Sequence, residues 1–120
     1  MNAVARRILI VDDNQELAEN LAELLEDEGH TTTTADSGER AIDISGGLDF
    51  DLLLSDVRMP GINGVELVIR LRVYRPRLCC LLMSAYSSEE LRREAKSAGV
   101  AAILDKPLDL DELLCRVTCC

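Results

Sequence analysis

Aromatic residues are scarce in this 120-residue sequence, which holds one Phe, two Tyr and no Trp. A flavin carrier would need aromatic side chains to flank the flavin ring, and no glycine loop suited to a phosphate follows the first apolar run. The sequence therefore argues against a flavin carrier.

Long apolar runs and an excess of basic residues are also missing. No run approaches the roughly 20 residues that span a bilayer, and residues 1–7 lack the apolar centre of a secretion signal. The 13 basic and 22 acidic residues give a net charge of -9, which repels nucleic-acid backbones and favours a cation as ligand. We expect a cytoplasmic protein that contacts neither membranes nor nucleic acid directly.

The five cysteines cannot all pair with one another. Cys79 and Cys80 lie in an apolar run, so we predict that they are small core residues in a reducing compartment. Cys115 and Cys119 are spaced to share one face of a helix, but no His or Cys-x-x-Cys partner accompanies them. No metal or redox role is therefore predicted for the cysteines.

The sequence alternates short apolar runs with amphipathic segments, which predicts one α/β domain over residues 1–120. Parallel strands with right-handed crossovers place helices on both faces of the sheet. The run of four threonines at residues 31–34 is polar enough for an edge strand. Ser87 with Glu90 resembles a capping box, and the helix that it opens has few apolar residues to anchor it. Because the sequence stops as the fifth helix ends, we also expect that a longer parent protein exists. The predicted strands cover residues 7–11, 31–34, 52–54, 78–83 and 101–104.

Polar side chains follow four of the predicted strands: Asp12 with Asp13, then Asp56, Ser84 and Lys106. Parallel pairing gathers the carboxyl ends of these strands at one rim of the sheet, where ligands bind in open α/β folds. Three carboxylates there repel one another by roughly 1 to 4 kcal/mol per pair unless a cation intervenes. Oxygen ligands at an open rim suit Mg²⁺. Asp56 would then be free to attack phosphorus while Lys106 and Ser84 hold the phosphoryl oxygens.

Each of these residues also has a purely structural interpretation. Asp13 or Asn14 could cap the first helix, and Asp56 could be an ordinary aspartate before the Pro60-Gly61 turn. Ser84 could be a strand-end hydroxyl and Lys106 a solvated loop lysine. Taken separately, these interpretations do not explain why residues suited to binding a metal and a phosphoryl group follow four different strands.

Four motifs together resemble the response-regulator receiver domain over nearly the whole sequence. The resemblance implies a flavodoxin-like (βα)5 fold with a five-stranded parallel sheet of order 2-1-3-4-5. It also implies a cis peptide bond between Lys106 and Pro107. The motifs are Val11-Asp12-Asp13, the LSDVRMPGING stretch at residues 54–64, Met83-Ser84-Ala85 and Asp105-Lys106-Pro107.

The resemblance implies a two-component or phosphorelay protein in which Asp56 accepts a phosphoryl group from a histidine kinase or a histidine phosphotransfer protein. Mg²⁺ would be held by Asp12, Asp13, Asp56 and the backbone carbonyl of Arg58. The only histidine, His30, lies at a predicted helix-to-strand turn, so the kinase must act in trans or from a part of the parent protein absent here. Such a domain is a signalling module and not an enzyme: it catalyses only its own phosphorylation and dephosphorylation.

By the same resemblance, Ser84 and Lys106 contact the phosphoryl group, and the fourth helix, fifth strand and fifth helix form the surface that a downstream output domain or protein reads. The family usually carries Tyr or Phe three residues before the lysine, where this sequence has Ile103. An isoleucine has no ring to rotate. Tyr86 is the aromatic residue near the site instead. The residues assigned to switching and tuning are Arg58, Ala85, Tyr86, Ile103 and Pro107.

A homodimer is compatible with this sequence. Two other functions compete with the receiver interpretation. A pseudo-receiver would keep the fold as an interaction module without phosphorylation, which retention of the full residue set disfavours. A small Mg²⁺-dependent phosphohydrolase also forms an aspartyl-phosphate, but it typically needs a second acid two residues after the nucleophile, where this sequence has Arg58. Turnover of a model phosphoester would favour the hydrolase.

Overall fold

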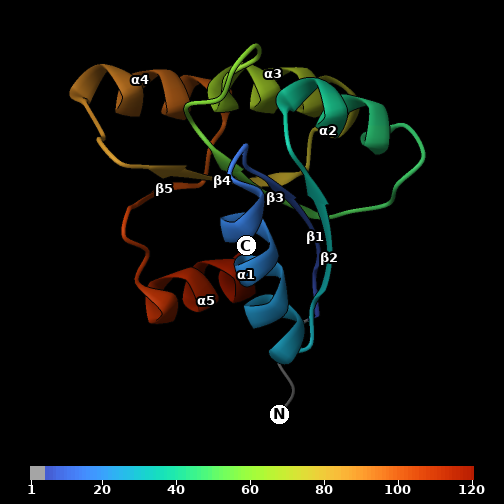
Figure 1. Ribbon diagram of the computed structural model, residues 1–120. Helices are drawn as coiled ribbons and strands as arrows, with labels where there is room; N and C mark the ends of the chain where they lie inside the picture. The colour runs from blue at the N-terminus through green and yellow to red at the C-terminus, as the bar shows by residue number, and fades with distance from the viewer. Residues whose placement is uncertain (1–4) are drawn as a thin grey trace.

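The computed structural model describes residues 5–120 and consists of a five-stranded parallel sheet with helices on both faces (Figure 1). The strand order is β2-β1-β3-β4-β5, which confirms the predicted order. Along the chain the elements are β1 (Arg7–Val11), α1 (Gln15–Asp27), β2 (Thr31–Ala35), α2 (Gly38–Ser45), β3 (Leu52–Asp56), α3 (Gly64–Tyr74), β4 (Cys79–Ser84), α4 (Glu89–Ala98), β5 (Ala102–Asp105) and α5 (Leu110–Cys119).

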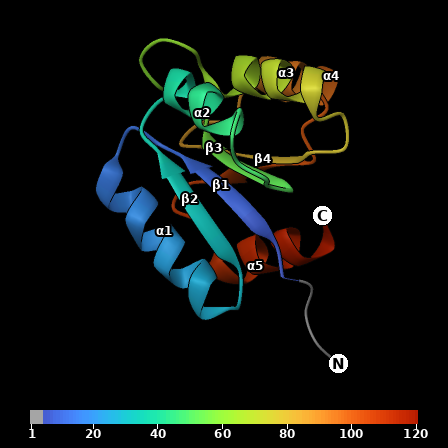
Figure 2. The same ribbon diagram turned by 90° about the vertical axis from the view of Figure 1, so that its right-hand side faces the viewer.

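Two apolar cores lie on opposite faces of the sheet, because successive strand residues point to opposite sides. Leu9 and Leu53 face the layer of α2, α3 and α4, whereas Ile10 and Leu54 face α1 and α5. Figures 1 and 2 show these two helical layers above and below the sheet. The central strands β1 and β3 are therefore covered on both faces, as their continuous apolar runs predict.

The outer elements follow the sequence pattern with one correction. The polar strand β2 lies at an edge of the sheet, and α4 is thinly anchored, since Ala95 is its only buried residue. The predicted cap of α4 at Ser87 is wrong. Ser88 caps this helix by accepting a hydrogen bond from Leu91 N at 3.0 Å, because the Ser87 hydroxyl donates to Asp105 Oδ1 instead.

The prediction for the cysteines holds for Cys80 and is wrong for Cys79. Cys80 is buried in the core as a free thiol, but Cys79 forms a disulfide with Cys120, with their Cα atoms 5.9 Å apart. The two residues are 41 positions apart in sequence, and they meet only because the end of α5 packs beside the start of β4. Periodicity along the sequence carries no signal for such a long-range approach.

Candidate functional site

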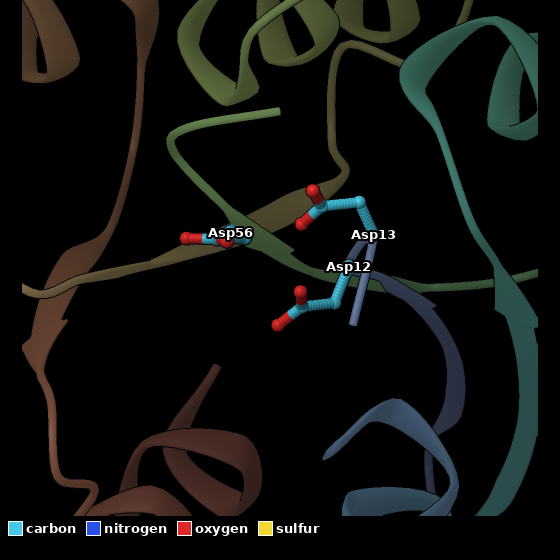
Figure 3. A group of neighbouring side chains, drawn as sticks. All are labelled: Asp12, Asp13 and Asp56. Atoms are coloured by element: carbon cyan, nitrogen blue, oxygen red, sulfur yellow. The ribbon is translucent and has the colours of Figure 1, made fainter. Parts of the chain in front are cut away.

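Three aspartate side chains meet at the carboxyl ends of β1 and β3. Asp56 is the last residue of β3, and Asp12 and Asp13 follow β1 directly. The parallel register pairs Val11 with Ser55, so the two strands end side by side. Each aspartate offers an oxygen within 4.8 Å of the others, and Figure 3 shows their carboxylates grouped around one space.

Asp12 is the most constrained of the three. Its side chain is 1% exposed, and its Oδ1 atom accepts a hydrogen bond from Asn14 N at 2.9 Å. The buried Oδ2 atom has no hydrogen-bond partner. Burial is the main cause that raises the pKa of Asp12 above its usual 3.8, and the charges of Asp56 and Asp13 raise it further. An unpartnered oxygen among repelling carboxylates fits a hard divalent cation such as Mg²⁺.

Lys106 adds a positive charge to the same site from the loop after β5. Its ammonium nitrogen lies 3.5 Å from Asp56 Oδ1 and 3.8 Å from Asp12 Oδ2. Its backbone N–H donates to Ser84 O at 2.9 Å, and its peptide bond to Pro107 is cis. The lysine is therefore held over the carboxylates, and the interpretation as a solvated loop lysine is wrong.

Ser84 ends β4, the strand beside β3, and its side chain is directed elsewhere. The buried hydroxyl donates to Tyr86 O at 2.7 Å and accepts from Tyr86 N at 3.1 Å, which closes a tight turn at the strand end. A contact from this hydroxyl to a group on Asp56 would require these two bonds to be exchanged. The turn leads to α4 within a few residues.

The structural interpretations are wrong for Asp13 and Asp56, whereas the helix cap expected at Asp13 or Asn14 is confirmed for Asn14. Asn14, not Asp13, caps α1, because the Asn14 side chain accepts a hydrogen bond from Leu17 N at 3.1 Å. Asp13 is left exposed beside the other carboxylates. Asp56 lies within β3 and is 9% exposed, so it is not a surface turn residue.

Gly64 supports the end of β3, a role that its place at the end of the 54–64 motif did not reveal. A Cβ atom at this position would lie 2.5 Å from the carbonyl oxygen of Asp56 and 3.0 Å from Cα of Val57. Only glycine lets the start of α3 approach the end of β3 so closely. The available signal was a glycine directly after the helix-capping residue Asn63, a place where no glycine is needed for the helix itself.

The predicted tuning residues lie around the rim with different exposures. Arg58 and Ala85 are exposed, and Tyr86 is 72% exposed. Ile103 is half-buried and packs against the core under α2, α3 and α4. The roles assigned to these residues stay predictions.

Comparison with known proteins agrees with this geometry. The sequence profile of the response regulator receiver domain matches residues 8–118. The chain is 39% identical over 109 residues to a response regulator receiver protein of Anaeromyxobacter, which covers 91% of the chain and 46% of that protein. It is 35% identical to sporulation initiation phosphotransferase F of Bacillus subtilis, with 89% and 86% covered. The chain thus spans about half the length of the first of these relatives.

Solved structures show the same fold. The chemotaxis protein CheY4 of Vibrio cholerae superposes with a TM-score of 0.89 at 28% identity, covering 95% of this chain and 97% of that one. The response regulator TrrA of Thermotoga maritima, solved in complex with Mg²⁺ and beryllofluoride, gives 0.83 at 33% identity, with 93% and 96% covered. The family match over residues 8–118 spans nearly the whole sheet and every motif of the rim. The chain therefore belongs to the family of response regulator receiver domains, the phosphoacceptor modules of two-component signalling.

Proposed function

We propose that Asp56 is the phosphoacceptor of this receiver domain and takes its phosphoryl group from a histidine kinase or a histidine phosphotransfer protein. The observation that carries the proposal is the meeting of Asp12, Asp13 and Asp56 within 4.8 Å, with Lys106 3.5 Å from Asp56. We treat residues 1–120 as one such domain and its location as cytoplasmic. Within the described residues, no helix has both the length and the apolar character needed to cross a membrane.

In the proposed reaction an Asp56 oxygen attacks phosphorus, the bond from phosphorus to the donor nitrogen breaks, and the electron pair leaves with that nitrogen. Asp12, Asp13, Asp56 and the backbone carbonyl of Arg58 would hold Mg²⁺, which supplies charge neutralisation for the phosphoryl oxygens when bound. Lys106 stabilises the added negative charge because its ammonium already lies beside Asp56. The chain contributes positioning and electrostatics, as in a signalling domain that catalyses only its own phosphorylation and dephosphorylation.

The phosphoryl state would then be transmitted through Ser84. An aspartyl phosphate carries about two negative charges where the free Asp56 carboxylate carries one, and it brings strong acceptor oxygens toward this hydroxyl. If Ser84 turns toward Asp56, it gives up its two bonds to the Tyr86 backbone, which frees the turn leading to α4. Because α4 buries only Ala95, it is the element most easily displaced.

The proposed rearrangement of Ser84 predicts which elements change their environment on phosphorylation. Beryllofluoride with Mg²⁺, which imitates the phosphoryl group, is expected to shift backbone amide resonances mainly in α4, β5 and α5, besides the site itself. The measurement is a pair of ¹H–¹⁵N spectra with and without beryllofluoride, with Asp56→Asn as a control that should show no change. Shifts confined to α1, β2 and α2 would refute the proposed output surface.

The exposed side chains of Arg58 and Tyr86 are proposed to slow loss of the phosphoryl group. Each follows a strand-end residue, Asp56 or Ser84, by two positions, and there it would restrict the approach of water. The double variant Arg58→Ala/Tyr86→Ala is expected to lose its phosphoryl group several-fold faster than the wild type. The rate is measured by following the phosphorylated mass after removal of the donor. An unchanged rate would contradict this role.

The proposed phosphotransfer is tested by intact-mass analysis after incubation with acetyl phosphate. The wild type is expected to gain the mass of one phosphoryl group with Mg²⁺ and none when Mg²⁺ is removed by a chelator. A pseudo-receiver would gain no mass under either condition. Rapid multiple turnover of a model phosphoester would instead support a phosphohydrolase, although exposed Arg58 stands where that class needs an acid.

A further inference from the structure

Two free thiols lie side by side on the exposed face of α5. The sulfur atoms of Cys115 and Cys119 are 3.9 Å apart, and both residues are exposed. Their spacing of four residues places them on one stripe of the helix, whereas Leu113 and Val117 occupy the buried face. Cys80 differs from this pair because it is buried, which raises the pKa of its thiol to about 11, whereas the pKa of Cys115 is raised chiefly by its contact with Cys119.

The distance between the two sulfurs matches a tetrahedral metal site. With zinc–sulfur bonds of about 2.3 Å at a tetrahedral angle, two thiolates on one Zn²⁺ are about 3.8 Å apart. A two-coordinate linear arrangement with bonds of that length would need about 4.6 Å. The side chains therefore already hold the separation that a four-coordinate soft cation requires, and thiolates select such cations over Mg²⁺.

The chain by itself supplies only two of the four ligands. Within residues 5–120, the three aspartates form the only group of three or more potential ligand atoms close enough to share an ion, so no third ligand joins Cys115 and Cys119. Closed zinc sites take four protein ligands. A two-fold axis through the cation would bring the same pair from a second copy and complete the tetrahedron.

We propose that Cys115 and Cys119 form half of a tetrathiolate site for Zn²⁺ or a similar thiophilic divalent cation, which a second copy of this chain completes. Each thiol releases its proton to solvent as its sulfur binds the cation, so no oxidant or reductant is involved. The cation then joins two α5 helices into a dimer. At a net charge of -9 two copies repel each other, so this pairing depends on the cation.

This site is independent of the aspartates. Arg6 Nε donates to Val117 O at 3.2 Å, so the end of α5 lies beside the start of β1 (Figure 2). Asp12 and Asp56 lie at the other, carboxyl end of the strands. Changes at Asp56 should therefore leave cation-dependent pairing intact. Failure of one site says nothing about the other.

The test is an anaerobic titration of the whole chain with Co²⁺, without added thiol reductant, followed by optical spectroscopy and sedimentation. With excess Mg²⁺ present to occupy the aspartates, we expect thiolate-to-cobalt charge-transfer bands with tetrahedral d–d bands, one thiolate-bound ion per two chains, and conversion of monomer to dimer. Mutation of a residue that only hydrogen-bonds a metal ligand typically lowers metal affinity by roughly 10-fold or more. Loss of a direct ligand should cost at least as much, so Cys115→Ser and Cys119→Ser should each bind Co²⁺ at least about 10-fold more weakly. The double variant should show no charge-transfer band.

Two controls separate this site from the other candidates. The variant Cys79→Ser/Cys120→Ser should keep the full signal, because it leaves the α5 pair unchanged, and so should Asp56→Asn. The proposal is overturned if the charge-transfer bands survive in Cys115→Ser/Cys119→Ser, if they vanish in Cys79→Ser/Cys120→Ser, or if they develop while the wild type stays a monomer.

Discussion

Replacing Asp56 with asparagine is expected to abolish phosphorylation by acetyl phosphate. The amide keeps the size and shape of the side chain at the end of β3, where Asp56 is 9% exposed, but it removes the anionic oxygen that attacks phosphorus. Intact-mass analysis should show no gain for the variant under conditions that modify the wild type. Because the nucleophile itself is lost, the expected effect is complete rather than partial.

A matched control uses another carboxylate at a strand end. Asp105 closes β5 and is exposed, and its Oδ1 atom accepts a hydrogen bond from Ser87 rather than facing the aspartate cluster. Asp105→Asn should therefore still be phosphorylated. A mass gain that persists in Asp56→Asn would show that another carboxylate accepts the phosphoryl group, and the proposed role of Asp56 would fail.

Replacing Asp12 with asparagine should have opposite effects on metal binding and on stability. The amide oxygen can still accept the hydrogen bond from Asn14 N, but one of the repelling charges around Asp56 is removed. We expect Mg²⁺ affinity to fall at least about 10-fold. Without Mg²⁺, the free energy of unfolding should rise, because each repelling carboxylate pair costs roughly 1 to 4 kcal/mol. Urea unfolding with and without Mg²⁺ measures both effects.

The gain in stability should also depend on pH. Burial and the neighbouring charges raise the pKa of Asp12 above 3.8, so the folded chain binds this proton more tightly than the unfolded chain does. The stability of the wild type relative to Asp12→Asn is therefore highest below pH 3.8 and is lost as pH rises through the raised pKa. Asp13→Asn should lose Mg²⁺ affinity without this gain, because Asp13 is exposed. Equal unfolding free energies of wild type and Asp12→Asn at neutral pH would contradict the proposed repulsion.

The fold was largely predictable because its elements carry local signals. The apolar runs of β1 and β3 indicate strands covered on both faces, and the threonines of β2 indicate an edge. The order of the strands came from the resemblance to receiver domains, since local patterns do not specify which strands pair. The disulfide of Cys79 with Cys120 was missed because it depends on how α5 packs against β4.

The candidate site was predictable as a set of residues but not in its detailed geometry. Parallel pairing explains why Asp12, Asp13 and Asp56 come together, and the structure shows that they do. The orientation of Ser84 was not predictable, because the turn at Tyr86 competes for its hydroxyl. The need for Gly64 was equally hidden, since it arises from the approach of α3 to the Asp56 carbonyl.

The most direct test of the central claim is a crystal structure of the chain with Mg²⁺ and beryllofluoride. We expect Mg²⁺ between the carboxylates of Asp12, Asp13 and Asp56, and beryllium bonded to an Asp56 oxygen with Lys106 in contact. The Ser84 hydroxyl should have left the Tyr86 backbone for the bound group. Beryllofluoride on a different carboxylate, or Mg²⁺ bound away from these three residues, would contradict the account.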